Sequence, residues 1–293
     1  MKRRIAHIIN PFIASESSDL HTAQPITFAS MLHAKEKAAD VVDVELWSAH
    51  YPEDRSIVHP AFSRTKELDR SVLDLGDFEK KMKLPLIHDI MQRLYDSSDA
   101  EYFIYTNVDI GVYPDFYLQV NEWIESGLDG FIINRRRIPA HFTRVDQLEE
   151  IFLEKGKSHP GFDCFVFRRA LFPQMRLAEI CIGVPFIGIT FAQNLFALCD
   201  RFKLFEHEFL TFHIGMEIFK GRASREYFRY NRKQFWKAMH SDLKKHQSSK
   251  KLPYSQLPFP IRWVRWGLQP SIPIRFALLL EWRRLKRFLG FGK

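Results

Sequence analysis

The sequence is poor in cysteine. It has three cysteines in 293 residues, and no two of Cys164, Cys181 and Cys199 form a CxxC pair. An odd number without such a pair argues against a disulfide framework and against a structural zinc site. We therefore expect the protein to work in a reducing cytoplasm.

Long hydrophobic runs are also missing. No uninterrupted apolar stretch approaches the roughly 20 residues that are needed to cross a bilayer. The first residues combine basic and apolar side chains as a signal peptide does, but His7, Asn10 and Pro11 interrupt the run and no small-residue cleavage site follows. The start of the chain is therefore predicted to form a first sheet strand.

Acidic residues are scarce near the end of the chain. Residues 262–293 contain eight Lys and Arg residues and one acid, Glu281, and so carry +7 of the net charge of +8. Apolar residues recur at Leu278, Trp282 and Leu285 with basic residues between them. This spacing predicts an amphipathic basic helix that lies on an anionic membrane. The alternative is a helix docked on the body with its basic face in water.

Two tryptophans strengthen the membrane hypothesis. Trp263 and Trp266 stand beside Arg262 and Arg265, a combination that suits the interface between a bilayer and water. Nucleic acid would also attract this charge, but no nucleic-acid-binding motif accompanies it, so we expect no nucleic-acid partner. The expected location is the cytoplasm, peripherally attached to the inner face of the membrane.

The remaining sequence has the composition of an ordinary globular protein, 46% hydrophobic and 27% charged. Residues 246–260 contain three prolines and several serines, which is typical of a linker. We therefore predict one domain over residues 1–245, followed by a linker and basic tail over residues 246–293.

Predicted strands and helices alternate along the body of the chain. Residues 4–9 and 41–47 are predicted strands on either side of a predicted helix at 26–39, which indicates a βαβ unit and a parallel sheet. The later predicted strands are 102–105, 129–134, 164–167, 202–205 and 210–213, and the later predicted helices are 84–95, 115–125, 147–155, 186–198 and 224–245. The fold class is therefore α/β.

The most informative stretch surrounds the strand predicted at residues 102–105. That run is too short for a helix, and Pro114 closes the segment after it. Asn107 and Asp109 follow the run at the carboxyl end of the strand, where open α/β sheets bind ligands. A carboxylate there can hold a hard divalent cation, which in turn holds a diphosphate. The alternative is that Asp109 only stabilises the turn.

Three motifs, in this order, resemble those of the GT-A type glycosyltransferases, a family of nucleotide-diphospho-sugar transferases. Residues 106–110 (TNVDI) resemble the family's Asp-x-Asp motif at a strand end, and residues 160–165 (PGFDCF) are similar to its acceptor-side strand. Residues 211–215 (TFHIG) resemble the segment where many members supply a histidine to the metal. The resemblance spans roughly residues 1–215 and implies a Rossmann-like mixed, mostly parallel sheet flanked by helices.

The resemblance also implies a metal-dependent sugar transfer from a UDP- or GDP-sugar donor. A bound Mg²⁺ or Mn²⁺ stabilises the charge that develops on the departing phosphate. Asp109 would bind the metal, and His213 would be a further ligand, which suits Mn²⁺ better than Mg²⁺. Asn107 replaces the usual first Asp and would contact the ribose or a metal-bound water instead. The alternative for His213 is a core histidine hydrogen-bonded to backbone.

An inverting transfer also needs a base near the acceptor hydroxyl. Asp163 is the candidate because it is expected to begin a buried strand after a Pro-Gly turn, although it could serve only to stabilise that turn. Relatives often carry an acid after an Ile-Gly-x-Pro segment, whereas here residues 182–185 (IGVP) are followed by 186–188 (FIG). The stereochemical course is therefore left open.

Four further residues are predicted to contact the nucleotide. Arg135 and Arg136 follow a predicted strand, and a guanidinium binds phosphate through two parallel hydrogen bonds. The alternative for an arginine run is a solvated surface patch. Asn10 at the end of the first strand and Asp89 on the helix before the central strand complete the set, with helix capping and surface exposure as their alternatives.

The sequence thus predicts a glycosyltransferase that transfers a sugar to a glycan or lipid-linked acceptor at the cytoplasmic membrane face. A nucleotidyltransferase on a related fold is the first alternative, although Asn10-Pro11-Phe12 is not the Gly-rich phosphate loop that it would need after strand one. The second is a non-catalytic protein that binds membranes or polyanions on a decayed transferase scaffold.

Overall fold

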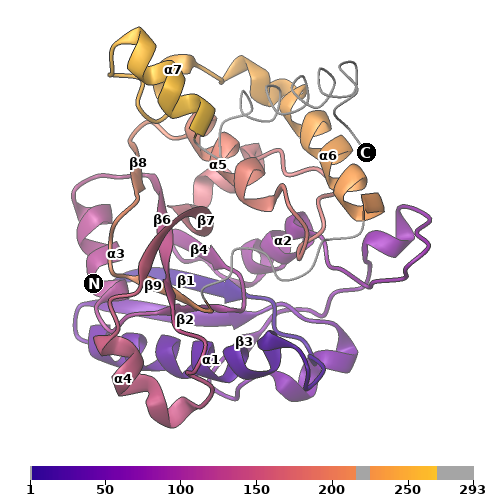
Figure 1. Cartoon of the computed structure of the whole chain (residues 1–293), viewed down its shortest axis with the longest axis vertical. Coiled ribbons are helices and arrows are strands. Elements are labelled where there is room, and N and C mark those ends of the chain that lie inside the picture. Colours follow the sequence, from indigo (N-terminus) through magenta and orange to yellow (C-terminus); the bar gives the residue numbers. More distant parts are fainter. Residues whose placement is uncertain (1, 216–224, 269–293) are drawn as a thin grey trace, which may run out of the picture.

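The buried apolar runs of the sequence join one sheet. The structure is a computed structural model that describes residues 2–215 and 225–268. Figure 1 shows the nine strands of these residues at the centre of the molecule. They are β1 (Arg3–Ile9), β2 (Val42–Ser48), β3 (Ser63–Arg64), β4 (Tyr102–Thr106), β5 (Ile110–Val112), β6 (Gly130–Ile138), β7 (Lys157–Arg168), β8 (Phe202–Phe205) and β9 (Thr211–Ile214).

Helices connect the strands and cover the sheet. They are α1 (Asp19–Ala38), α2 (Ile87–Ser97), α3 (Phe116–Glu125), α4 (Leu148–Leu153), α5 (Ile187–Leu198), α6 (Arg225–Met239) and α7 (Phe259–Leu268). Short 3₁₀ helices lie between them, the longest at Pro52–Ile57 and Arg169–Gln174.

The sheet is mixed and mostly parallel, as predicted. Its strand order is β3-β2-β1-β4-β7-β6-β9-β5, and β8 also pairs with β6. Within the described residues five pairings are parallel and three are antiparallel, namely β4 with β7, β6 with β7 and β5 with β9. Because β1, β2 and β4 run in the same direction, their carboxyl ends meet at one edge of the sheet.

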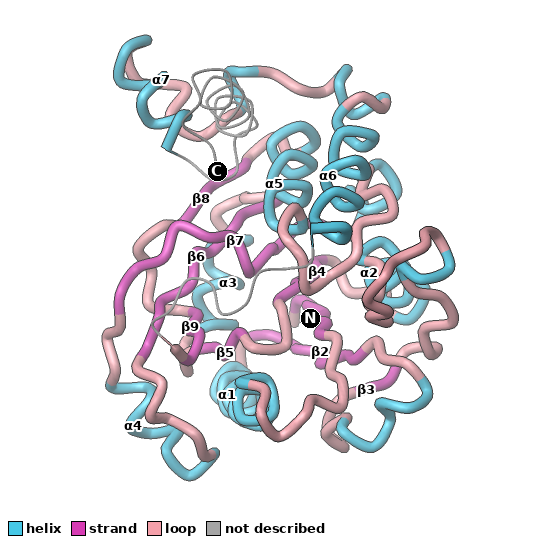
Figure 2. Tube along the Cα trace, turned by 45° about the vertical axis from the view of Figure 1, so that its right-hand side comes forward, coloured by secondary structure: helices cyan, strands magenta, loops and turns pink. Residues whose placement is uncertain are grey.

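Two layers of helices sandwich the sheet, and strand alternation decides which residues face each layer. Ala6 and Phe103 face α2, α5 and α6, whereas Ile5 and Ile104 face α1 and α3. Figure 2 shows α1 on the opposite side of the sheet from α5 and α6. Ten of the twelve residues of α5 are buried, because this apolar helix packs against both β7 and α6.

Several boundaries differ from the prediction. Helix α2 begins at Ile87, so Pro85 precedes the helix instead of lying in its first turn. Pro160 and Gly161 lie inside β7 and not in a turn before it, because β7 pairs with β6 as far as Lys157 through two register shifts. The structure also contains the short strand β5 and helix α7, neither of which was predicted. The tail helix predicted around residues 278–289 lies outside the described residues.

Candidate active site

The turn after β4 brings Asp109 to His213. The amide of Ile110 donates to the Asn107 carbonyl at 3.1 Å, which closes the turn and starts β5. Strand β5 then runs antiparallel to β9, with Ile110 opposite His213. The His213 Nε2 atom lies 3.2 Å from the Asp109 Oδ2 atom as a result. The two side chains are thus 104 positions apart in the sequence, and the sheet holds them in contact.

A glycine makes this close pairing of β5 and β9 possible. Gly111 stands opposite Phe212 in the register of the two strands. A Cβ atom at position 111 would lie 2.2 Å from the Phe212 ring, which is far inside van der Waals contact. The absence of a side chain at Gly111 therefore lets the ring cross β5, and it supports the geometry of the neighbouring Asp109 and His213.

A second ion pair joins the two antiparallel strands β6 and β7. An Nη1 atom of Arg135 on β6 lies 2.7 Å from Oδ2 of Asp163 on β7, and both side chains are largely buried. The charges of Arg135 and His213 both act on Asp109, and that of Asp109 acts on Asp163. The four side chains therefore form one cluster, which we call the edge cluster (Asp109, His213, Arg135 and Asp163).

Three further residues adjoin the edge cluster. Arg137 shares a face of β6 with Arg135 because side chains alternate along a strand, and it stands opposite His213 in the register of β9. The His159 Nδ1 atom accepts from the Gly161 amide at 2.8 Å. A Cβ at Gly161 would meet the His159 ring at 2.5 Å and Asp163 Oδ2 at 3.3 Å, so this glycine lies between the two side chains.

The pKa values of the two carboxylates shift in opposite directions. Burial alone would raise the pKa of Asp109, but the hydrogen bond and charge of His213, together with the charge of Arg135, lower it below its ordinary value. Burial raises the pKa of Asp163, and the charge of Asp109 adds to this rise, while Arg135 opposes it. Asp109 is thus the better cation ligand, and Asp163 is the better proton acceptor.

Two neighbouring groups are kept neutral. Burial, followed by the charges of Arg135 and Arg137, lowers the pKa of His159 to about 4. Burial and the nearby carboxylates raise the pKa of Tyr105 above its ordinary value, and its hydroxyl donates to Asn107 Oδ1 at 3.0 Å. Asn107 is therefore held at the cluster by a strand residue that the sequence did not single out.

Several buried polar atoms at this edge lack a hydrogen-bond partner among the described residues. They are both side-chain atoms of Asn134, the Nε atom of Arg135 and the Nδ1 atom of His213. Most buried polar groups in proteins are paired, and an unpaired one costs about 1–3 kcal/mol. A bound water, ion or ligand would satisfy such atoms, so this edge is a candidate binding site.

The other predicted contacts have different partners. The Asn10 amide donates to the Ala49 carbonyl at 2.6 Å and so joins the carboxyl ends of β1 and β2. Asp89 is held by two hydrogen bonds of 2.7 Å from Arg70. Arg136 points to the opposite face from Arg135, where it donates to the carbonyls of residues 155 and 156 and its guanidinium stacks on a ring.

The start of α5 lies beside the edge cluster but carries no acid. A Cβ at Gly188 would lie 2.8 Å from the Phe162 carbonyl, so the first turn of α5 touches β7 next to Asp163. Phe186, the residue before the helix, has a left-handed φ of 98°. The segment that follows Pro185 therefore reaches the site with apolar side chains and glycine only.

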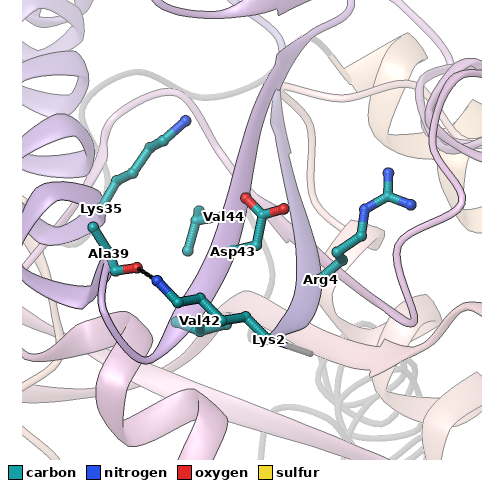
Figure 3. Close-up of a pocket in the computed structure, with 7 residues that line it drawn as sticks. All are labelled: Lys2, Arg4, Lys35, Ala39, Val42, Asp43 and Val44. Atoms are coloured by element: carbon teal, nitrogen blue, oxygen red, sulfur yellow. Dashed lines mark hydrogen bonds between the residues drawn. The ribbon is translucent and has the colours of Figure 1, made fainter.

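The cavity drawn in Figure 3 lies at the other edge of the sheet. Its volume is about 330 Å³, and it is lined by residues at the amino ends of β1 and β2 and near the end of α1: Lys2, Arg4, Lys35, Ala39, Val42, Asp43 and Val44. Because β1 and β2 are parallel, these amino ends lie away from the edge that carries Asp109. The cavity is therefore separate from the candidate site.

The mostly parallel sheet covered by helices on both faces has a GT-A type fold. The crystal structure of S. aureus TarS residues 1–349 with UDP-GlcNAc is similar over 98% of this chain and 88% of that chain, with 10% identity and a TM-score of 0.52.

Two further solved structures are more distant. A mycobacterial protein covers 80% of this chain and 74% of its own, with 13% identity and a TM-score of 0.43. The 4-diphosphocytidyl-2C-methyl-D-erythritol synthase of Anaerococcus prevotii covers 79% and 98%, with 11% identity and a TM-score of 0.38. At these identities the similarity to solved structures bears on the fold alone.

Other comparisons give no match. The chain matches no protein-family model and no curated protein in sequence.

Among residues 2–215 and 225–268, no helix has the length and apolar character needed to span a membrane. The same residues contain no group of three or more His, Cys, Asp and Glu side chains that could hold a metal ion.

Proposed function

We propose that the protein is a metal-dependent glycosyltransferase that transfers a sugar from a nucleotide diphosphate to a glycan or lipid-linked acceptor. The observation that carries this proposal is the contact of 3.2 Å between Asp109 and His213 at the carboxyl edge of a GT-A type sheet. A Rossmann-like sheet binds its ligands at this edge, and the edge cluster supplies charged groups there.

The two side chains could share a divalent cation that replaces the His213 Nε2 proton lying between them. Two ligands that bind one Mg²⁺ or Mn²⁺ at right angles, each at about 2.1 Å, lie about 3 Å apart, close to the observed separation of Asp109 and His213. With two protein ligands, the remaining positions would be taken by water and by phosphate oxygens, which is common for Mg²⁺ at phosphate sites. When bound, the cation would neutralise charge on the leaving diphosphate.

Arg135 is suited to hold the diphosphate. A guanidinium has five N–H donors, and the described contacts of Arg135 use one of its nitrogens on Asp163. Its Nε atom has no hydrogen-bond partner among the described residues. Arg135 could therefore contact a phosphate oxygen while it remains beside Asp163, which would orient the donor next to the base.

Asp163 is suited to accept the proton of the acceptor hydroxyl. A general base is most effective when its pKa approaches the working pH, and burial together with Asp109 raises the pKa of Asp163. Asp163 is buried on β7, and the first turn of α5 touches the neighbouring Phe162, so the carboxylate is screened from bulk water. An acceptor sugar would be positioned against these two elements.

The nucleotidyltransferase alternative receives less support from the loop after β1. Such an enzyme would use backbone amides of this loop to hold phosphates. Here the Phe12 amide donates to Gln24 Oε1 at 3.0 Å and the Phe12 carbonyl accepts from Gln24 Nε2 at 2.9 Å. The loop is thus occupied by a side chain of α1. A decayed, non-catalytic scaffold remains the second alternative, because of Asn107 and the missing acid after Pro185.

We also propose that the enzyme works at the inner face of a membrane, where it attaches to anionic lipid through residues 262–293. The support is the net charge of this segment, because each Lys or Arg near an anionic surface contributes about 1 kcal/mol to binding. A lipid-linked acceptor would be encountered at the same surface.

The proposed function is tested by thermal unfolding with UDP, GDP and Mn²⁺. We expect one nucleotide to stabilise the protein only when Mn²⁺ is present, by about 2.7 kcal/mol at a concentration 100 times its dissociation constant. Asp109→Ala should remove this effect. Asp146→Ala is the matched control, because Asp146 is exposed, lies in a 3₁₀ helix outside the sheet and pairs with Arg144.

The outcomes separate the three hypotheses. A nucleotide effect that needs Mn²⁺ and Asp109, followed by consumption of a UDP- or GDP-sugar, supports the transferase. Pyrophosphate formation from a nucleoside triphosphate and a sugar phosphate would support the nucleotidyltransferase. No nucleotide response in a protein that still binds vesicles would leave the non-catalytic scaffold.

A further inference from the structure

Helix α7 presents an apolar face to solvent. The side chains of Phe259, Ile261, Trp263 and Val264 are 63%, 52%, 41% and 62% exposed. At about 100° per residue, Ile261 and Val264 point about 140° and 160° away from the buried Trp266, whereas Phe259 and Trp263 lie about 20° and 60° from it. Ile261 and Val264 therefore form the outer face of α7. A helix that is apolar on its outer face as well as its inner one is normally covered on both sides.

The helix is fixed to the body by its inner face. The indole of Trp266 donates to the Pro253 carbonyl at 2.7 Å, and Arg262 donates to the Ser255 carbonyl at 3.2 Å. Trp263 and Trp266, which the sequence pairs as interfacial residues, lie about 60° apart around the helix; Trp263 is partly exposed, whereas Trp266 is buried. Figures 1 and 2 show α7 at the periphery of the molecule, beyond α5.

Basic residues border the apolar face. Arg265 lies over the Tyr254 ring, and the Arg262 guanidinium lies over the Trp266 ring at 5.0 Å from its centre. Pro253 and Tyr254 also line a cavity of about 410 Å³ between β8 and residues 250–256. Its lining includes three lysines (Lys203, Lys250 and Lys251) and two acidic residues (Asp200 and Glu206).

We infer that the outer face of α7 is the surface by which the folded body docks on an anionic bilayer. Apolar side chains flanked by arginine and lysine match the boundary between acyl chains and negative headgroups, where tryptophan is also favoured. The excess of basic over acidic residues around α7 selects an anionic surface. This inference rests on the membrane attachment proposed above, and it assigns the contact to a helix that is fixed on the body.

The position of α7 has a consequence for orientation. A tail that binds through charge alone holds a protein near a surface without fixing its angle. Because α7 is held by Trp266 and Arg262, its insertion would turn the body in one direction relative to the bilayer. The edge cluster would then face a defined side of the membrane surface.

The test is flotation of the full chain with phosphatidylcholine vesicles and with vesicles that contain about one third phosphatidylglycerol. We expect binding to the anionic vesicles only. The double variant Ile261→Asn/Val264→Asn should bind them about tenfold or more weakly, because two apolar side chains no longer leave water. Leu153→Asn is the matched control, since Leu153 is 84% exposed on α4 and should bind as the wild type does.

A second measurement locates the contact directly. Brominated lipids should quench the fluorescence of Trp263 in the bound protein, and Trp263→Phe should remove this quenched component. Equal vesicle binding by wild type and Ile261→Asn/Val264→Asn would overturn the inference. So would a concentration-dependent dimer, seen by light scattering, that the double variant abolishes, because a second copy would then be the partner of this face.

Nucleotide binding distinguishes this inference from the proposed activity. The double variant should keep the Mn²⁺-dependent response to nucleotide, because α7 contributes no side chain to the edge cluster. Vesicle binding without any nucleotide response would leave the α7 inference standing while the transferase proposal fails. Failure of the wild type to bind anionic vesicles would overturn both the α7 inference and the proposed attachment.

Discussion

Two groups of buried polar residues on the central strands differ in how they are paired. His7 on β1 is fully buried, and its ring nitrogens lie 2.8 Å from the hydroxyls of Tyr117 and Thr106. Burial lowers the pKa of His7 to about 3, so the ring is neutral at physiological pH. Every polar atom of this side chain has a partner, and no net charge is buried.

The edge cluster lies just beyond Thr106 and is built differently. It contains charges of both signs, and Arg135 and His213 each keep a nitrogen without a hydrogen-bond partner among the described residues. The comparison teaches that burial of polar groups does not by itself identify a site. A network that is complete supports the fold, whereas a charged one that is incomplete supports binding.

The largest effect is expected for Asp163→Asn. The amide keeps the shape of the side chain but cannot accept a proton, so kcat should fall about 100- to 10,000-fold, the usual range for loss of a general base. Donor affinity should change little, since Asp109, His213 and Arg135 remain. The measurement is the rate of donor consumption together with the dissociation constant of the donor. An unchanged kcat would show that Asp163 serves only as the ion-pair partner of Arg135.

His7→Leu should act on stability instead. The substitution leaves the hydroxyls of Thr106 and Tyr117 buried without their partner, which should lower the free energy of unfolding by about 2–4 kcal/mol. Urea unfolding measures this loss. Adding Thr106→Val should return part of it, because one unpaired hydroxyl is then removed. If the effects of the two substitutions on the free energy of unfolding were additive, the side chains of His7 and Thr106 would not be energetically coupled.

Gly111→Ala should have a smaller effect that links the two regions. The new methyl group meets the Phe212 ring, and overpacking of this kind costs about 1–3 kcal/mol. Strand β5 must move away from β9, so the Mn²⁺-dependent response to nucleotide should weaken as well. Phe212→Leu in the same chain should restore both properties in part. A variant with normal stability and normal metal response would show that this contact does not set the geometry of Asp109 and His213.

The smallest effect, with a sign specific to each carboxylate, is expected in the pH dependence of stability. The pKa of Asp109 is below the ordinary value of 3.8 in the folded state, so its charge contributes stability above that pH, and this contribution is lost as the pH falls through the lowered pKa. The pKa of Asp163 is raised above 3.8, so its ionisation opposes folding increasingly as the pH rises through that raised pKa.

Urea unfolding between about pH 3 and 7 checks both signs. The stability difference between wild type and Asp109→Asn should grow in favour of the wild type as the pH rises. The difference for Asp163→Asn should shift in the opposite direction, against the wild type. The same sign for both variants would contradict the electrostatic distinction between the two carboxylates.

The sequence predicts much of the fold because its strands are short apolar runs separated by turn residues. The buried run before Asp109 and the order of strands and helices follow from this local pattern. Strand β5 is too short to carry a period, and α7 was not separated from the proline-containing linker before it. The extension of β7 through Pro160 depends on its pairing with β6, a tertiary effect that no local pattern records.

The candidate site is predictable in its residues more than in its contacts. Asp109 and His213 come from motifs, and their juxtaposition agrees with the resemblance, while their role as metal ligands stays a prediction. The pairing of Arg135 with Asp163 depends on the register of β6 and β7, which the sequence alone does not fix. Arg137 was missed, although the alternation of side chains after Arg135 was a signal that could have found it.

The pairing of β5 with β9 has a consequence for synthesis of the protein. Asp109 leaves the ribosome 104 residues ahead of His213, an interval of roughly 5–20 s at about 5–20 residues per second. During that time β1, β2 and β4 can associate, but the carboxylate has no imidazole beside it. The candidate site is thus completed only when β9 docks, so a nascent chain that stalls before β9 would carry most of the sheet and none of the proposed metal affinity.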